Sequence, residues 1–164
     1  MEFEFTLRFQ LSEAVSDDEA LERLGAAGCT DALVGNGVAG KLSLMYCREA
    51  ESAQHAIRDA LAEVTQALPD AELIEAAPDL VGLTDIAELI GVSRQNMRKL
   101  MLTHSPQFPR PIHDGKTALW HLIDVVEWLN QRGSSRLTPG ISELARATLQ
   151  LNLQKALQRY ANCL

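Results

Sequence analysis

The side chains best suited to a chemical role lie on a short basic segment in the second half of the chain. Arginine, glutamine and asparagine can pair with base edges in the major groove of DNA, and lysine and arginine can neutralise phosphates. Such side chains occupy the positions expected to face outward from a helix: Arg94, Gln95, Asn96, Arg98 and Lys99. A solvated helix face would have the same composition, so the neighbouring residues must decide between the two interpretations.

The residues around this segment predict a helix-turn-helix. Thr84 and Ser93 are expected to cap the two helices, and Gly91 permits the turn between them. Small or apolar residues occupy the inner positions, namely Ile86, Ala87, Leu89, Ile90, Val92, Met97 and Leu100. Because this pattern specifies the crossing that presents the second helix to a groove, it favours DNA binding over a solvated face.

The following segment predicts a wing and a third helix. Prolines at positions 106, 109 and 111 cannot continue a helix, so the chain should be extended there. Asp114 and Gly115 lie between two short strand-like runs, which predicts a hairpin over residues 112–120. Asp124 is expected to cap a helix that includes Val125, Val126, Trp128 and Leu129 and ends near Gly133.

Residues from about 80 to 131 resemble the winged helix-turn-helix of MerR-type regulators and phage excisionase-like proteins. The resemblance depends on residues 83–87 and 91–93, and then on Phe108, Pro109, Pro111, Trp120, Asp124, Val125, Trp128 and Leu129. In such proteins the second helix enters the major groove and the wing touches the flanking backbone. The resemblance implies that DNA is contacted by Ser93, Arg94, Gln95, Asn96, Arg98 and Lys99 from the helix and by His113 and Lys116 from the wing, with Thr84 at the start of the first helix. The chain departs from the MerR pattern because an acidic domain precedes the module.

Charge is distributed unevenly along the 164 residues. Residues 1–80 hold 16 acids and 5 bases, whereas the remainder holds 6 acids and 10 bases. Such asymmetry is typical of chains in which one part binds nucleic acid. We therefore expect an acidic domain over residues 1–78, a DNA-binding domain over residues 79–133 and a terminal helix over residues 138–164.

The acidic half predicts elements in the order β-α-β-β-α-β. Apolar and polar residues alternate from Phe3 to Leu11, as in a strand with one buried face, and Ser16 with Glu19 forms a capping box before a short helix that ends at Gly25 or Gly28. The remaining elements are strands over 29–34, 41–47 and 71–77 and an amphipathic helix over 50–68. This order fits a ferredoxin-like sandwich. For the whole chain the predicted fold class is α+β, in which this sandwich is followed by an all-α winged helix-turn-helix with a long C-terminal helix.

Residues 35–40 match the G-x-G-x-x-G pattern of dinucleotide-binding folds. That fingerprint requires a helix after the third glycine, whose amides meet the pyrophosphate. Here residues 41–47 alternate as a strand, so we interpret the glycines as positive-φ turn residues in a hairpin. No cofactor is expected.

The C-terminal segment predicts a helix that needs an apolar partner. Thr138 and Pro139 have the form of a helix start, and one apolar stripe follows: Ile141, Ala145, Leu149, Leu153, Ala156, Leu157, Tyr160 and Leu164. Leu144 and Leu151 add a smaller second stripe. The stripe could fold back on its own chain or pair with a second copy, and we favour a homodimer.

Other classes of protein find little support in the sequence. Three cysteines without a C-x-x-C pair, and His113 and His121 without a carboxylate or thiolate spaced beside them, predict no metal site. No apolar run approaches the roughly 20 residues of a spanning helix, and the acidic N-terminus does not resemble a leader, so we expect a cytoplasmic protein associated with the nucleoid when bound to DNA. No nucleophile lies beside a base, which argues against an enzyme.

Two interpretations of function remain open. The first is a sequence-specific regulator that binds double-stranded DNA as a homodimer, with an N-terminal domain that binds a small ligand or a protein. The alternative is an antitoxin-like or adaptor protein, in which the acidic domain binds a basic partner and the helix-turn-helix autoregulates the operon.

Overall fold

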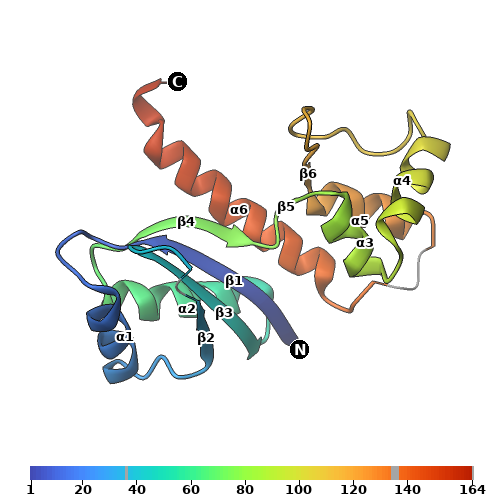
Figure 1. The fold of residues 1–164 in the computed structure, drawn as a ribbon. Coiled ribbons are helices and arrows are strands. Elements are labelled where there is room, and N and C mark those ends of the chain that lie inside the picture. Colours follow the sequence, from blue (N-terminus) through green and yellow to red (C-terminus); the bar gives the residue numbers. More distant parts are fainter. Residues whose placement is uncertain (36, 134–136, 164) are drawn as a thin grey trace. The chain divides into compact units, whose positions relative to one another are not determined.

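The computed structural model describes residues 1–35, 37–133 and 137–163 (Figure 1). Helices make up 47% and strands 21% of the chain, which confirms the α+β class. The chain divides into two compact units, residues 1–77 with 150–164 and residues 78–149. The terminal helix, expected to be a separate segment, therefore contributes its first part to one unit and its second part to the other.

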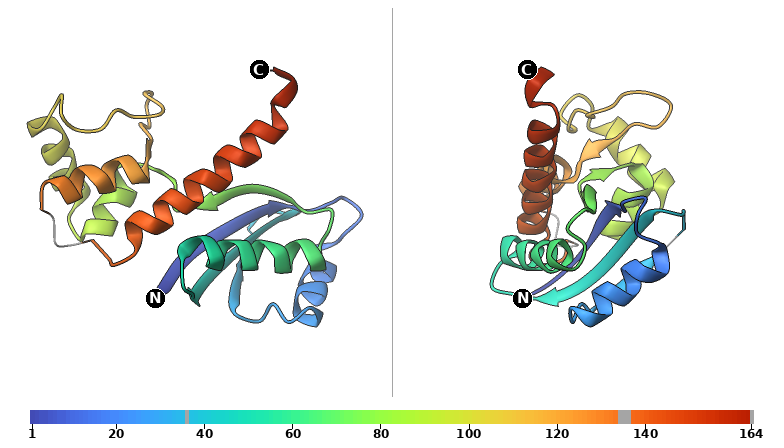
Figure 2. Two further views of the ribbon diagram at one scale, coloured as in Figure 1. Left: turned by 180° about the vertical axis from the view of Figure 1, so that it is seen from behind. Right: turned by 90° about the vertical axis from the view of Figure 1, so that its left-hand side faces the viewer.

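The first unit contains a four-stranded antiparallel sheet in the order β2-β3-β1-β4. Helices α1 and α2 lie on one face of this sheet (Figures 1 and 2). The elements are β1 (Glu2–Gln10), α1 (Asp17–Ala26), β2 (Ala32–Gly35), β3 (Lys41–Glu49), α2 (Ala53–Ala67) and β4 (Glu72–Ala77). The predicted order of strands and helices is present, and β2 is shifted towards the C-terminus by one to three residues relative to the prediction.

The alternation of apolar residues at the N-terminus produces the central strand of this sheet. The odd-numbered side chains of β1 are buried against the helices, and the strand pairs with β3 along all 9 of its residues. α1 begins after Ser16, whose hydroxyl accepts a hydrogen bond from the Glu19 N–H at 3.1 Å, as the capping box predicts. Ser52 caps α2 in the same way, through the His55 N–H.

The loop between β2 and β3 contains the glycine-rich motif. β3 begins at Lys41, immediately after the third glycine, so no helix follows the motif, in agreement with the prediction. Gly40 has a positive φ of 79°, whereas Gly35 is the last residue of β2 and does not have a positive φ, so the prediction is wrong at that glycine. Asn36, in the predicted turn, lies outside the described residues.

The second unit is a small helical core with a two-stranded sheet. Its elements are β5 (Leu80–Val81), α3 (Leu83–Ile90), α4 (Arg94–Thr103), β6 (Trp120–His121), α5 (Leu122–Gln131) and the first part of α6 (Ile141–Arg159). β5 pairs with β6, so the expectation of an all-α module needs correction. Ile86, Met97, Leu122, Val125 and Val126 form the centre of the core, each at most 1% exposed.

The first part of α6 buries residues of both predicted stripes. Its buried residues in the second unit are Leu144, Ala145, Ala147 and Thr148, and Ile141 and Leu149 of the predicted major stripe pack, partly buried, against the same core. Farther along the helix, Leu153, Leu157 and Tyr160 of the predicted major stripe are about half exposed. A short 3-10 turn follows at Ala161–Cys163, and Leu164 lies outside the described residues.

Candidate nucleic-acid interface

The turn between α3 and α4 is fixed by its backbone hydrogen bonds. Gly91 adopts a left-handed conformation with a φ of 73°, which a residue with a Cβ adopts only at a cost. The Val92 N–H donates to the Ala87 carbonyl at 2.9 Å and the Gly91 N–H to the Glu88 carbonyl at 3.2 Å. These two bonds form a Schellman motif, so the direction in which the chain leaves α3 is determined locally.

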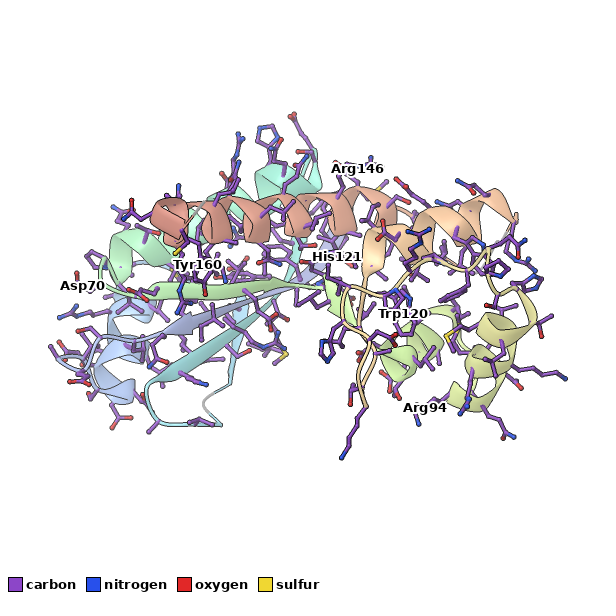
Figure 3. All side chains as sticks on the ribbon, turned by 90° about the horizontal axis from the view of Figure 1, so that it is seen from above. Asp70, Arg94, Trp120, His121, Arg146 and Tyr160 are labelled. Carbon is purple, nitrogen blue, oxygen red and sulfur yellow. The ribbon has the colours of Figure 1, made fainter. Side chains whose placement is uncertain are left out.

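α4 begins at once after this turn and exposes its polar side chains. The Ser93 hydroxyl accepts a hydrogen bond from the Asn96 N–H at 3.1 Å, as predicted for a helix cap. Met97 is fully buried and anchors the helix to the core, with Leu100 half-buried beside it. The predicted contact residues of this helix are all exposed: Ser93, Arg94, Gln95, Asn96, Arg98 and Lys99. Figure 3 shows Arg94 at the surface of the molecule.

Thr84 does not cap α3. The helix begins at Leu83 with Gly82 as its N-cap, and Thr84 is an exposed residue of the first turn. The Asp85 carboxylate accepts a hydrogen bond from the Gly82 N–H at 2.9 Å. Because this carboxylate binds the backbone at Gly82, the helix starts two residues earlier than a threonine cap would allow.

The wing is a loop closed by a single bridge, so the predicted hairpin with two strands is wrong in detail. His113 and Leu119 pair, with N–H to carbonyl distances of 3.2 and 3.0 Å, and residues 114–118 form the loop between them. His113 and Lys116 are exposed on it. Trp120, which was expected to continue the hairpin, pairs instead with Val81 of β5.

Both ends of the wing are tied to the core. The Trp120 indole N–H donates to the Pro109 carbonyl at 2.9 Å, and the ring packs edge-on against Phe108. A hydrogen bond of 2.8 Å joins His121 Nδ1 to the buried carboxylate of Asp79. α5 then begins at Leu122, with His121 as N-cap, so Asp124 lies in the first turn and does not cap the helix as predicted. Figure 3 labels Trp120 and His121 at this junction.

A cavity of about 720 Å³ separates α4 from the wing. It brings together four of the predicted residues, Thr84, Arg94, Arg98 and Lys116. Arg110 also lines it and was missed from the sequence, where the available signal was an isolated base between two prolines. Ser93, Gln95, Asn96, Lys99 and His113 do not line the cavity and are exposed outside it.

The cations of this surface have no ion-pair partner in the part of the chain that the structure describes. Among the described residues, none of Arg94, Arg98, Lys99, Arg110 and Lys116 forms an ion pair. In the same unit Arg146 does have a partner, Glu127, at 2.8 Å. Unpaired exposed cations retain their full attraction for an anion, because no neighbouring carboxylate has to be displaced first.

The first unit has its own cluster of titratable groups. Arg48 donates to both carboxylate oxygens of Asp31 at 2.9 Å and to Glu63 at 3.0 Å, and these bonds raise its pKa although its burial acts in the opposite direction. Burial raises the pKa of the Tyr46 phenol above its ordinary value. It also raises the pKa of the Cys29 thiol. The Tyr46 hydroxyl is buried and has no hydrogen-bond partner among the described residues.

A second group on this unit resembles a set of metal ligands only in its composition. The side chains of Glu2, Glu4 and Cys47 lie close together on adjacent strands and are all exposed. A hydrogen bond with Glu2 is the main reason that the pKa of the Cys47 thiol is raised, which disfavours the thiolate that would bind a metal.

Comparisons with known proteins supply no relative. No family model, curated protein or solved structure matches the chain. In the described part of the chain, none of the helices combines the length and the apolar character needed to span a bilayer.

Proposed function

We propose that this protein is a sequence-specific, DNA-binding transcriptional regulator of the cytoplasm. One observation carries the proposal: α4 is anchored by the buried Met97, while its side chains Arg94, Gln95 and Arg98 are exposed and the two arginines form no ion pair among the described residues. Guanidinium and amide groups of this kind pair with guanine and adenine in the major groove. Lys116 on the wing would contact the flanking phosphates, as would Arg110 on the proline segment that precedes the wing.

The details of the two domains belong to the same proposal. We assign the second unit to the winged helix-turn-helix class because a Schellman turn joins its two helices and a loop with a cation follows them. We assign the first unit to the ferredoxin-like class because it has the β-α-β-β-α-β order and the antiparallel strand order β2-β3-β1-β4.

We also propose that the protein binds DNA as a homodimer. Leu153, Leu157 and Tyr160 recur at helical spacing on α6 and are about half exposed. A second copy of the helix would cover them, and a two-fold dimer would match half-sites separated by about 34 Å or a multiple.

A second function of antitoxin or adaptor type is favoured by the charge of the first unit. Residues 1–77 and 150–164 hold 15 acids and 7 bases. A basic protein partner would be attracted to this unit, while a small ligand sensed there would not need the excess of acids. The two functions differ in what must bind the first unit, whereas both require DNA binding by α4.

Selection of duplexes from a random library by the full chain tests the DNA proposal. The selected duplex is then titrated by fluorescence anisotropy with the wild type, Arg94→Ala, Arg98→Ala and the control Arg58→Ala, which removes an exposed arginine from α2. We expect each α4 variant to bind about tenfold more weakly, because a bidentate arginine–base contact contributes on the order of 1–3 kcal/mol, and the control to bind normally. The proposal fails if no duplex is enriched or if all three variants bind like the wild type.

A further inference from the structure

The cavity between α4 and the wing has the size of a small-molecule site. Its volume of about 720 Å³ lies within the range of roughly 300–1,000 Å³ that is typical of ligand pockets. Most of the residues that line it are exposed, so it is a groove that opens to solvent between α4 and the wing and not a void of the core.

Apolar side chains form the inner wall of the cavity. Phe108 and Trp120, at most 7% exposed, lie at its base, and Leu83 and Met101 are half-buried beside them. The indole N–H of Trp120 is already bonded to Pro109, so it offers no polar group to the cavity. An apolar ligand body would gain free energy on this wall by leaving water.

Cationic side chains stand at two opposite sides of the cavity. Arg94 and Arg98 are one helical turn apart on α4, while Arg110 and Lys116 belong to the proline segment and the wing. Two acids, Asp85 and Asp114, also line the cavity, but the Asp85 carboxylate accepts a bond from the Gly82 N–H. The cations exceed the acids by two, so an acidic group is the favoured polar part of a ligand.

The walls of the cavity are held in place by contacts within the protein. The Phe108 N–H donates to the His104 carbonyl at the end of α4, and the Ile112 N–H donates to Leu119 at 2.7 Å. Phe108 packs edge-on against both Trp120 and Trp128. A site whose walls are already ordered loses little conformational freedom on binding, which favours affinity for small ligands.

From these observations we infer that the cavity binds a small organic anion, in which an apolar body is joined to a carboxylate, sulfonate or phosphate group. The body lies on the wall of Phe108, Trp120 and Met101, and the acidic group pairs with Arg98 and Arg110. The regulatory consequence rests on the proposed function: Arg98 and Arg110 cannot pair with the ligand and with DNA at once, so the anion releases DNA.

The probe for this site is anilinonaphthalene sulfonate, an aromatic anion that fluoresces in apolar surroundings. It is titrated into the full-length protein without DNA, beside N-phenylnaphthylamine, which keeps the rings and lacks the sulfonate. We expect one saturable site for the anion, and binding about tenfold weaker for the neutral compound and for Arg98→Ala or Arg110→Ala. Lys99→Ala is the matched control, because Lys99 is an exposed cation of the same helix that does not line the cavity.

Three outcomes decide the inference. Equal affinity of wild type, Arg98→Ala and Arg110→Ala overturns it, as does equal binding of the neutral compound. Leu102→Glu, which places a carboxylate at an exposed position of the lining, should abolish the fluorescence signal, and unchanged binding of the probe to this variant also counts against the site.

The regulatory step has its own test. Release of the selected duplex by the probe supports this step, and a stable ternary complex of protein, probe and duplex overturns it. Because the titration contains no DNA, a failure of the DNA proposal leaves the result for the cavity interpretable.

Discussion

The side-chain amide of Asn152 forms two hydrogen bonds with the backbone of Ala76, 76 residues earlier in the chain. Its Oδ1 accepts from the Ala76 N–H and its Nδ2 donates to the Ala76 carbonyl, both at 2.8 Å. β4 is an edge strand of the sheet, and Lys155 donates to the carbonyl of its bulged residue Ile74. The second part of α6 thus satisfies backbone groups that an open edge would offer to another chain.

We predict that Asn152→Ala destabilises the protein by about 1–3 kcal/mol, because it leaves two backbone groups of β4 without partners. Chemical denaturation followed by circular dichroism measures the change. Gln154→Ala, at an exposed position of the same helix, is the control and should shift the free energy of unfolding by less than about 0.5 kcal/mol. Equal effects of the two substitutions would show that the amide does not stabilise the edge.

Tyr46 predicts a dependence of stability on alkaline pH. Because burial raises its pKa, the unfolded chain releases the phenolic proton at a lower pH than the folded protein. The contribution of this group to stability is therefore fully present below about pH 10 and is lost as the pH rises above that value, by up to about 1.4 kcal/mol per pH unit.

Tyr46→Phe removes both the titration and the buried hydroxyl that lacks a partner among the described residues. We expect the variant to be more stable than the wild type by about 1 kcal/mol at neutral pH, and the difference to grow above pH 10. Denaturant titrations at a series of pH values measure it. Tyr160→Phe, in an exposed position, should leave the neutral-pH stability unchanged, and a constant difference at all pH values would refute the assignment to Tyr46.

Local patterns were sufficient for the elements whose partners are near in sequence. The alternation in residues 3–11 predicted β1, the Ser16 hydroxyl caps α1, and Gly91 with Ser93 forms the turn before α4. Each of these features depends on a period or a cap within a few residues, which the sequence displays directly.

Features that depend on distant partners were missed or misplaced. The Asp114–Gly115 pair predicted a hairpin, but Trp120 pairs with Val81, which is 39 residues away. The helical period of α6 was visible, whereas the point at which its predicted stripe becomes exposed was not, because Ala145 and Leu153 differ in what packs against them. Arg110 belongs to the cavity through the path of the proline segment, and no local pattern marks that path.

The exposed stripe on α6 leads to a prediction about assembly. Leu157 is 58% exposed, so a charge there should leave the monomer folded and prevent a second copy from packing against it. We expect Leu157→Glu to weaken the dimer by at least about tenfold, seen as a lower mass in light scattering after size exclusion. Gln158→Glu adds the same charge at the adjacent exposed position and should retain the wild-type mass. A monomeric wild type would remove this interface from the proposal.

Arg94 and Lys116 should differ in how they affect binding to DNA. Lys116 lies on the wing, where it would meet a phosphate, so Lys116→Ala should weaken binding to every duplex alike and reduce the slope of log affinity against log salt by about 1. Arg94 lies at the start of α4, where it would meet a base, so Arg94→Ala should also relax the preference for the selected sequence. Anisotropy titrations on the selected and a scrambled duplex, at salt concentrations from about 50 to 200 mM, separate the two effects. If both variants lower affinity for the two duplexes by the same factor, α4 contacts only the backbone and does not determine the sequence preference.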